Sequence, residues 1–109
     1  ITNASVHDVN AMDVIEYEPL AGYIFDRGYW DLERLHKIEE LGAFFVIREK
    51  SKPKFVVEDG MDMPENGNIL QDYTVRFSGK RNASNYPSRI RRMVAYIPDL
   101  KRSFVFYTN

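Results

Sequence analysis

The sequence predicts an α/β domain in which a β-α-β unit is followed by a half built from antiparallel strands. Two short apolar runs flank a stretch of helical periodicity within residues 22–47, and this order is typical of a β-α-β unit. From about residue 53 onward, short strand-like segments are separated by stretches rich in Asn, Asp, Gly and Ser. A length of 109 residues fits one small domain or part of a larger one.

The first elements are a helix and a short strand. Apolar residues recur at near-helical spacing over residues 7–17, and Pro19 ends this predicted helix because proline has no amide proton to donate. The apolar run Gly22–Phe25 then predicts a buried strand. Gly28 allows the sharp turn that follows it.

Residues 31–41 form the clearest predicted helix. Asp31 is placed to cap its amino end, and Gly42 stands where helices commonly stop. The continuous apolar run 43–47 predicts a second strand, parallel to the first and joined to it by a right-handed crossover. Because both runs are apolar on both faces, we expect helices to cover both sides of this part of the sheet. The apolar stripe of the helix consists of Leu32, Leu35, Ile38 and Leu41.

The second half is expected to contain strands and loops but no helix. Several of its strand-like segments alternate polar and apolar residues, as a sheet with one solvated face does. The predicted strands are 54–57, 70–77, 91–97 and 102–107, and the predicted loops are 58–68 and 78–88.

Composition excludes some chemistry and suggests a partner. The chain has no cysteine, which excludes disulfides, thiolate metal sites and a cysteine nucleophile. No apolar run is long enough for a membrane helix, so no membrane partner is expected. The net charge of −1 hides an asymmetry. Residues 1–45 sum to −6 and residues 46–109 to +5, which favours a polyanionic partner on the basic side.

Asp26 is the one carboxylate that the sequence pattern itself puts at the carboxyl end of a strand. In open α/β sheets this edge holds the functional crevice, and carboxylate oxygens suit a hard divalent cation. An Asp at this place can equally cap the turn that follows it. The pattern alone leaves both roles open.

Basic residues follow the second strand at alternating positions. Extended side chains two residues apart share a side, so these cations are predicted to form a ridge at the same edge as Asp26. Such a ridge could position a phosphodiester backbone, or it could be an ordinary solvated strand exit. A second basic stretch, 80–92, has tyrosines nearby. The ridge residues are Arg48, Lys50, Lys52 and Lys54.

Other catalytic arrangements are not visible in the chain. His7 and His36 fall at positions that favour capping or surface roles, and no Ser-His-Asp set, HExxH motif or phosphate-binding glycine loop is present.

Two segments resemble the DDE transposases of bacterial insertion sequences, in the insertion sequence four group. The first is strand–Asp26-Arg-Gly-Tyr–helix, and the second is Gly42-Ala-Phe-Phe-Val-Ile-Arg-Glu-Lys-Ser-Lys52. Their order and spacing match the family. The opening Ile-Thr-Asn-Ala-Ser-Val-His and the closing Phe-Val-Phe-Tyr-Thr-Asn also look like the family, so the resemblance spans essentially the whole chain.

The resemblance implies a ribonuclease H-like fold and a metal-dependent DNA strand cleavage and transfer reaction. Residues 1–52 would form part of the catalytic core, and residues 53–109 a β-rich insertion in the same domain. Asp26 would be the second acid of an Asp-Asp-Glu triad that binds two Mg²⁺ (or Mn²⁺) ions. The parent protein would act as a homodimer on transposon ends and target DNA in the bacterial cytoplasm. The positions that match DNA-contacting sites near the active-site edge are Arg27, Tyr29, Arg48, Lys50 and Lys52.

The other two triad acids are expected outside this chain, the first Asp before residue 1 and the Glu after residue 109. With one ligand of three, the 109-residue chain alone is expected to be inactive. The alternative hypothesis is a non-catalytic module that binds nucleic acid or protein through its basic β-rich half.

Overall fold

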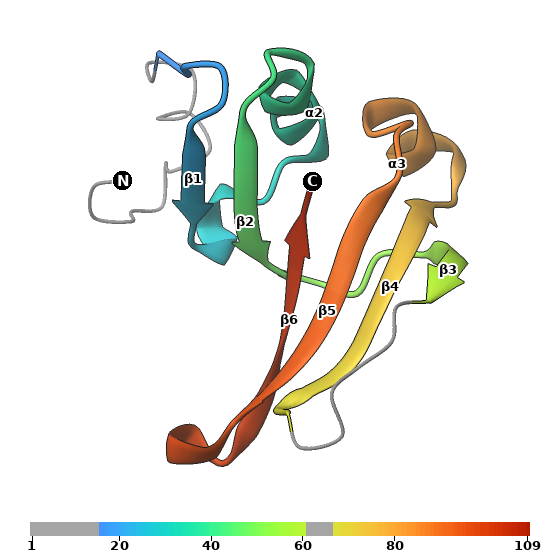
Figure 1. Ribbon diagram of the computed structural model, residues 1–109. Coiled ribbons are helices and arrows are strands. Elements are labelled where there is room, and N and C mark those ends of the chain that lie inside the picture. Colours follow the sequence, from blue (N-terminus) through green and yellow to red (C-terminus); the bar gives the residue numbers. More distant parts are fainter. Residues whose placement is uncertain (1–15, 61–66) are drawn as a thin grey trace.

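The computed structural model describes residues 16–60 and 67–109, which form a six-stranded mixed sheet with two α-helices (Figure 1). The strand order is β1-β2-β6-β5-β4-β3. β1 and β2 are parallel, and every other neighbouring pair is antiparallel. The elements are β1 (Gly22–Phe25), η2 (Arg27–Tyr29), α2 (Leu32–Glu40), β2 (Phe44–Arg48), β3 (Phe55–Gly60), β4 (Ile69–Phe77), α3 (Lys80–Asn85), β5 (Ile90–Ile97), η3 (Pro98–Leu100) and β6 (Arg102–Thr108).

The predicted β-α-β unit is confirmed in its elements and in the parallel pairing of its strands. Asp31 caps α2 by accepting a hydrogen bond from the Arg34 amide at 3.0 Å. Gly42 follows the helix with φ +80°, a backbone conformation that glycine adopts without strain. The predicted helix over 7–17 lies outside the described residues except for its last two, which are not helical.

Helix α3 contradicts the expectation that no helix follows residue 42. It has only six residues and no amphipathic repeat, so periodicity does not reveal it. Tyr86, directly after it, is fully buried and makes ring contacts with Phe45 and Phe77. This anchoring side chain, rather than intrinsic propensity, explains why the short helix forms here.

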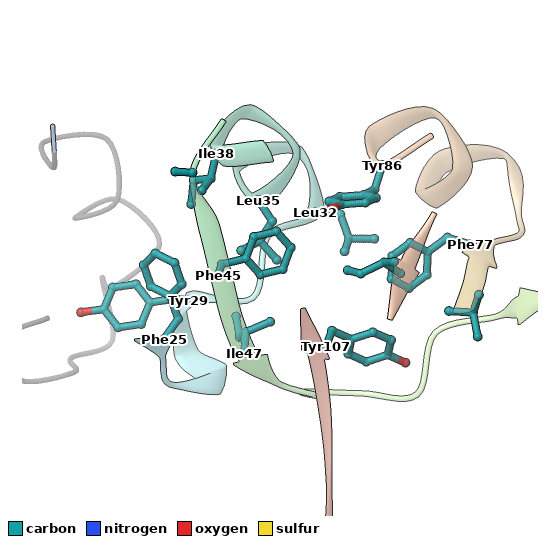
Figure 2. Close-up of a cluster of buried hydrophobic side chains, with 13 residues drawn as sticks. Phe25, Tyr29, Leu32, Leu35, Ile38, Phe45, Ile47, Phe77, Tyr86 and Tyr107 are labelled. Atoms are coloured by element: carbon teal, nitrogen blue, oxygen red, sulfur yellow. The ribbon is translucent and has the colours of Figure 1, made fainter. Parts of the chain in front are cut away.

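The core lies between the sheet and the two helices, on one face of the sheet (Figure 2). Leu32, Leu35 and Ile38 of α2 are buried there with Phe45 and Ile47 of β2, whereas Leu41, the fourth residue of the predicted stripe, is half exposed. The opposite face is more open than predicted. Its register aligns Ile24, Val46, Thr108 and Arg91 across β1, β2, β6 and β5.

The expectation that both faces of β1 and β2 are buried is therefore wrong for the part of the chain that the structure describes. Ile24 is 76% exposed and Phe44 is 48% exposed. An apolar run does not distinguish a strand buried on two faces from one buried on a single face, because it gives no information on what covers each face.

The antiparallel half is confirmed, with small shifts at the strand ends. β3 extends to Gly60, into the segment predicted to be loop. The division expected after residue 52 falls in the connection between β2 and β3. The two halves nevertheless share one sheet, because β6 pairs with β2.

Candidate nucleic-acid interface

The carboxyl ends of β1 and β2 lie at the same edge of the sheet, because the two strands are parallel. The last pair of this ladder is Phe25 with Ile47, so Asp26 and Arg48 are the residues that directly follow it in the two segments. We define the carboxyl-end edge as the four residues Asp26, Arg27, Arg48 and Lys50.

Asp26 caps the turn that follows β1, which is one of the two roles that the sequence pattern left open for it. Its Oδ1 accepts a hydrogen bond from the Arg27 amide at 2.8 Å, which fixes the start of η2. The residue is exposed, and its Oδ2 has no hydrogen-bond partner among the described residues. One carboxylate oxygen therefore faces solvent at this edge while the other holds the turn.

Arg27 and Tyr29 belong to the same short 3-10 helix but occupy different environments. Arg27 is exposed. Tyr29 is 1% exposed and packs on Phe25 with ring centroids 5.5 Å apart. The surface role that the resemblance implied for Tyr29 does not fit this burial. Its side chain supports η2 from the core side, beneath Asp26 and Arg27.

Arg48 ends β2 and lies on an aromatic ring of the neighbouring strand. Its guanidinium carbon is 4.7 Å from the centroid of Phe104, and the guanidinium of Arg102 is at the same distance from that ring. Cation–π contacts of this kind hold a cation in place without neutralising its charge. Lys50, two residues further on, is exposed.

The predicted four-residue ridge does not form. β2 ends at Arg48, and the Glu49 amide donates to the Val105 carbonyl at 2.9 Å. Residues 50 and 51 then bend, so the alternation of an extended strand is lost. Lys52 and Lys54 lie further along the connection to β3, where they line a pocket with residues of the β4–α3 loop.

A buried polar network directly behind the edge was not foreseen from the sequence. The Tyr107 hydroxyl donates to Glu49 Oε2 at 2.5 Å and accepts from Arg92 Nε at 3.0 Å. The guanidinium carbon of Arg92 also lies 4.6 Å from the centroid of the Phe55 ring. The network joins β6, β5 and the residue that follows β2. No spacing rule could have found it, because Glu49 and Tyr107 are 58 positions apart.

The second basic stretch, 80–92, is divided between paired and unpaired cations. Arg91 forms an ion pair with Asp72, Arg92 with Glu49, and Arg89 with Glu58. The charges of these three arginines are therefore largely balanced by acidic partners within the protein. Lys80 and Arg81 form no ion pair with any described residue.

The described residues contain no group of three or more acidic or histidine side chains placed to hold a metal ion. His36 interacts with Glu39, Glu40 and Ser88, as a surface-helix histidine does, and His7 lies outside the described residues. Within the described residues, no helix is long and apolar enough to cross a membrane.

Comparison with known proteins connects this chain with transposases. It is 36% identical over 97 residues to a protein of Sinorhizobium fredii (strain NBRC 101917 / NGR234) named "Putative transposase y4zB". The match covers 85% of this chain and 27% of the relative, so the chain spans about a quarter of that protein's length. No protein-family model matches the chain, and no solved structure matches it. The ribonuclease H-like core and the insertion sequence four group thus rest on the motif resemblance.

Proposed function

We propose that this chain is part of the catalytic domain of a DDE transposase, and that its carboxyl-end edge faces DNA. The observation that supports this most is the position of Asp26. In a chain with a transposase-like relative, the aspartate of the Asp-Arg-Gly-Tyr motif is exposed at the carboxyl end of β1, beside the basic end of β2. The insertion sequence four group and the ribonuclease H-like fold are included in this proposal.

Asp26 is suited to supply one ligand of a divalent metal site. Its Oδ2 is free of described partners, and carboxylate oxygen is the donor that Mg²⁺ and Mn²⁺ prefer. A bound ion would polarise a phosphodiester and lower the pKa of a water nucleophile. The hydrogen bond from the Arg27 amide fixes the carboxylate orientation. Because the described residues contain no group of three or more acidic or histidine side chains that could hold a metal ion, the remaining ligands would come from elsewhere in the parent protein.

The cations of the edge, of which Arg27 and Lys50 are exposed and Arg48 is partly buried, would position the DNA backbone. Arg27, Arg48 and Lys50 can each approach phosphate oxygens, and Phe104 holds the Arg48 guanidinium in place. Tyr29 supports this surface from within the core. In the parent protein we propose transposon ends and target DNA as substrates, a homodimer as the active assembly, and the bacterial cytoplasm as its location.

The alternative, a non-catalytic binding module, is not favoured. The similarity to the named relative extends over 97 residues and so includes both the β-α-β unit and much of the antiparallel half.

DNA affinity of the 109-residue chain tests the interface. We expect Arg48→Gln with Lys50→Gln to weaken binding to duplex DNA about tenfold and to reduce the slope of log K against log salt by about one to two. Glutamine keeps part of each aliphatic stem but removes the charge, including the guanidinium that lies on Phe104.

The matched control removes two exposed lysines away from the edge, with Lys37→Gln and Lys101→Asn; Asn tolerates the left-handed backbone of Lys101, where φ is 53°. An equal loss of affinity in the control and edge variants would refute the interface.

A further inference from the structure

The connection between β2 and β3 and the loop between β4 and α3 enclose an open pocket of about 490 Å³. Lys52 and Lys54 line it from the β2–β3 connection, and Lys80 and Arg81 from the start of α3. Trp30 is a further residue of the lining. We call this cavity the basic pocket. Its volume is much larger than a single phosphate ion requires and lies within the range of nucleotide-sized ligand sites.

The charge of the basic pocket is not balanced within the described part of the chain. Four of the residues that line it are cationic and none is acidic. None of the four forms an ion pair with a described residue, in contrast to Arg89, Arg91 and Arg92 of β5 and the turn before it. Four like charges that converge repel one another, and binding of an anion relieves that repulsion.

A backbone hydrogen bond and a ring contact hold the segments that line the basic pocket in place. The Ser78 amide donates to the Lys54 carbonyl at 3.0 Å, which joins the two loops where Phe55 pairs with Phe77. Trp30 packs on Tyr107 with ring centroids 5.2 Å apart. The backbone segments that carry the four cations are therefore held next to each other by the pairing of β3 with β4. The side chains of all four cations are exposed.

We propose that the basic pocket binds the sugar-phosphate backbone of a nucleic-acid strand, with the cations on its phosphates and Trp30 against a sugar or base. Bases stack on aromatic side chains without regard to sequence, which suits a contact that positions a strand rather than reads it. The proposal assigns Lys52 to this pocket and not to the carboxyl-end edge.

The pocket and the edge can be reached by one strand. Trp30 follows Asp26 by four residues, so their Cα atoms are at most about 15 Å apart. The inference rests on the proposed function only in taking nucleic acid as the partner, and it adds a second contact surface that the family motifs do not mark.

Two variants remove opposite walls of the pocket. Lys80→Ala with Arg81→Ala keeps good helix formers in α3, and Lys52→Ala with Lys54→Ala alters the β2–β3 connection. We expect each to weaken binding of single-stranded and duplex DNA about tenfold and to reduce the salt slope by about one to two, while Lys37→Gln with Lys101→Asn has little effect. In NMR spectra of the wild-type chain, DNA should shift the Trp30 indole N–H and the amides of residues 78–82.

The outcomes separate this inference from the proposed function. Loss of affinity in the Arg48→Gln, Lys50→Gln variant alone, with the pocket variants unaffected, would overturn the pocket and leave the carboxyl-end edge intact. Loss in the pocket variants alone would support the pocket and count against the edge. Shifts of Trp30 and residues 78–82 with inorganic phosphate but not with DNA would overturn nucleic acid as the ligand in favour of a free anion.

Discussion

At the scale of single residues, Tyr107 supports the carboxyl-end edge from the core. Its hydroxyl is hydrogen-bonded to Glu49, which lies between Arg48 and Lys50 in the sequence. Tyr107 is fully buried, and its hydroxyl is shared by Glu49 and Arg92, which are themselves 12% and 7% exposed in their side chains. A buried ion pair costs desolvation energy that its hydrogen bonds must offset. The hydroxyl supplies one of these bonds to each partner.

Replacing Tyr107 by Phe leaves both charged partners short of a hydrogen bond in a buried place. We expect the free energy of unfolding to fall by about 1–3 kcal/mol, measured by urea denaturation. Tyr96→Phe in β5 is the control, because no described residue is hydrogen-bonded to its hydroxyl, and it should change stability by less than about 0.5 kcal/mol. Equal effects of the two substitutions would show that the network contributes no net stability.

Stability should also fall at alkaline pH through the buried tyrosines. Burial, followed by the hydrogen bond and charge of Glu49, raises the pKa of Tyr107; burial, followed by the charge of Glu39, raises the pKa of Tyr86. The folded protein therefore keeps these protons at pH values where the unfolded chain, whose tyrosines have a pKa of about 10, releases them. Their contribution is complete below that pH and is lost as the pH rises above it.

Each of these tyrosines lowers the free energy of unfolding by at most about 1.4 kcal/mol per pH unit above about pH 10. Urea denaturation at several alkaline pH values should show a shallower decline for Tyr107→Phe than for the wild type. Parallel declines would show that Tyr107 does not have a raised pKa in the fold.

At the scale of elements, Gly42 determines how α2 is joined to β2. Its φ of +80° lies in the left-handed region, while a Cβ built there would meet only Pro19 Cβ, at 4.0 Å. Backbone conformation, not crowding, therefore requires glycine. We expect Gly42→Ala to lower the free energy of unfolding by about 1–2 kcal/mol in thermal or urea denaturation.

Gly22→Ala is the matched control for this substitution. Gly22 lies in β1, has no positive φ, and a Cβ there would meet no atom within 4 Å. Alanine at this strand position should be neutral or stabilise the fold by up to about 1 kcal/mol. A loss at Gly22 as large as that at Gly42 would contradict the conformational explanation.

The elements that local chemistry determines were predictable from the sequence. Asp31 as cap, Gly42 as stop and the parallel strands around α2 follow from short-range rules, and the structure agrees with them. Helix α3 was missed because Tyr86 stabilises it through contacts distant in sequence. The same limit applies to the candidate site. Asp26 and Arg48 could be placed at one edge by topology, but the Glu49–Tyr107–Arg92 network and the basic pocket require the fold of β3 to β6.

At the scale of the whole molecule, the sheet unites two halves of opposite charge. β6, from the basic half, pairs with β2 of the β-α-β unit and brings Arg102 and Phe104 to the side of Arg48. The carboxyl-end edge thus places Asp26 next to a basic strand end, with the basic pocket beyond Trp30. Under the proposed function, Asp26 at this edge binds a divalent metal ion and the neighbouring cations contact DNA.

Paramagnetic line broadening by Mn²⁺ tests that claim most directly. In amide NMR spectra of the 109-residue chain, low concentrations of Mn²⁺ should broaden the signals of residues 25–28 and of Arg48 first. Asp26→Asn should abolish this broadening, and because Asn caps helices as well as Asp does, η2 should remain formed. The control Asp59→Asn, on β3, should leave it unchanged. Broadening that centres elsewhere, or that persists in Asp26→Asn, would contradict a metal-binding role for Asp26.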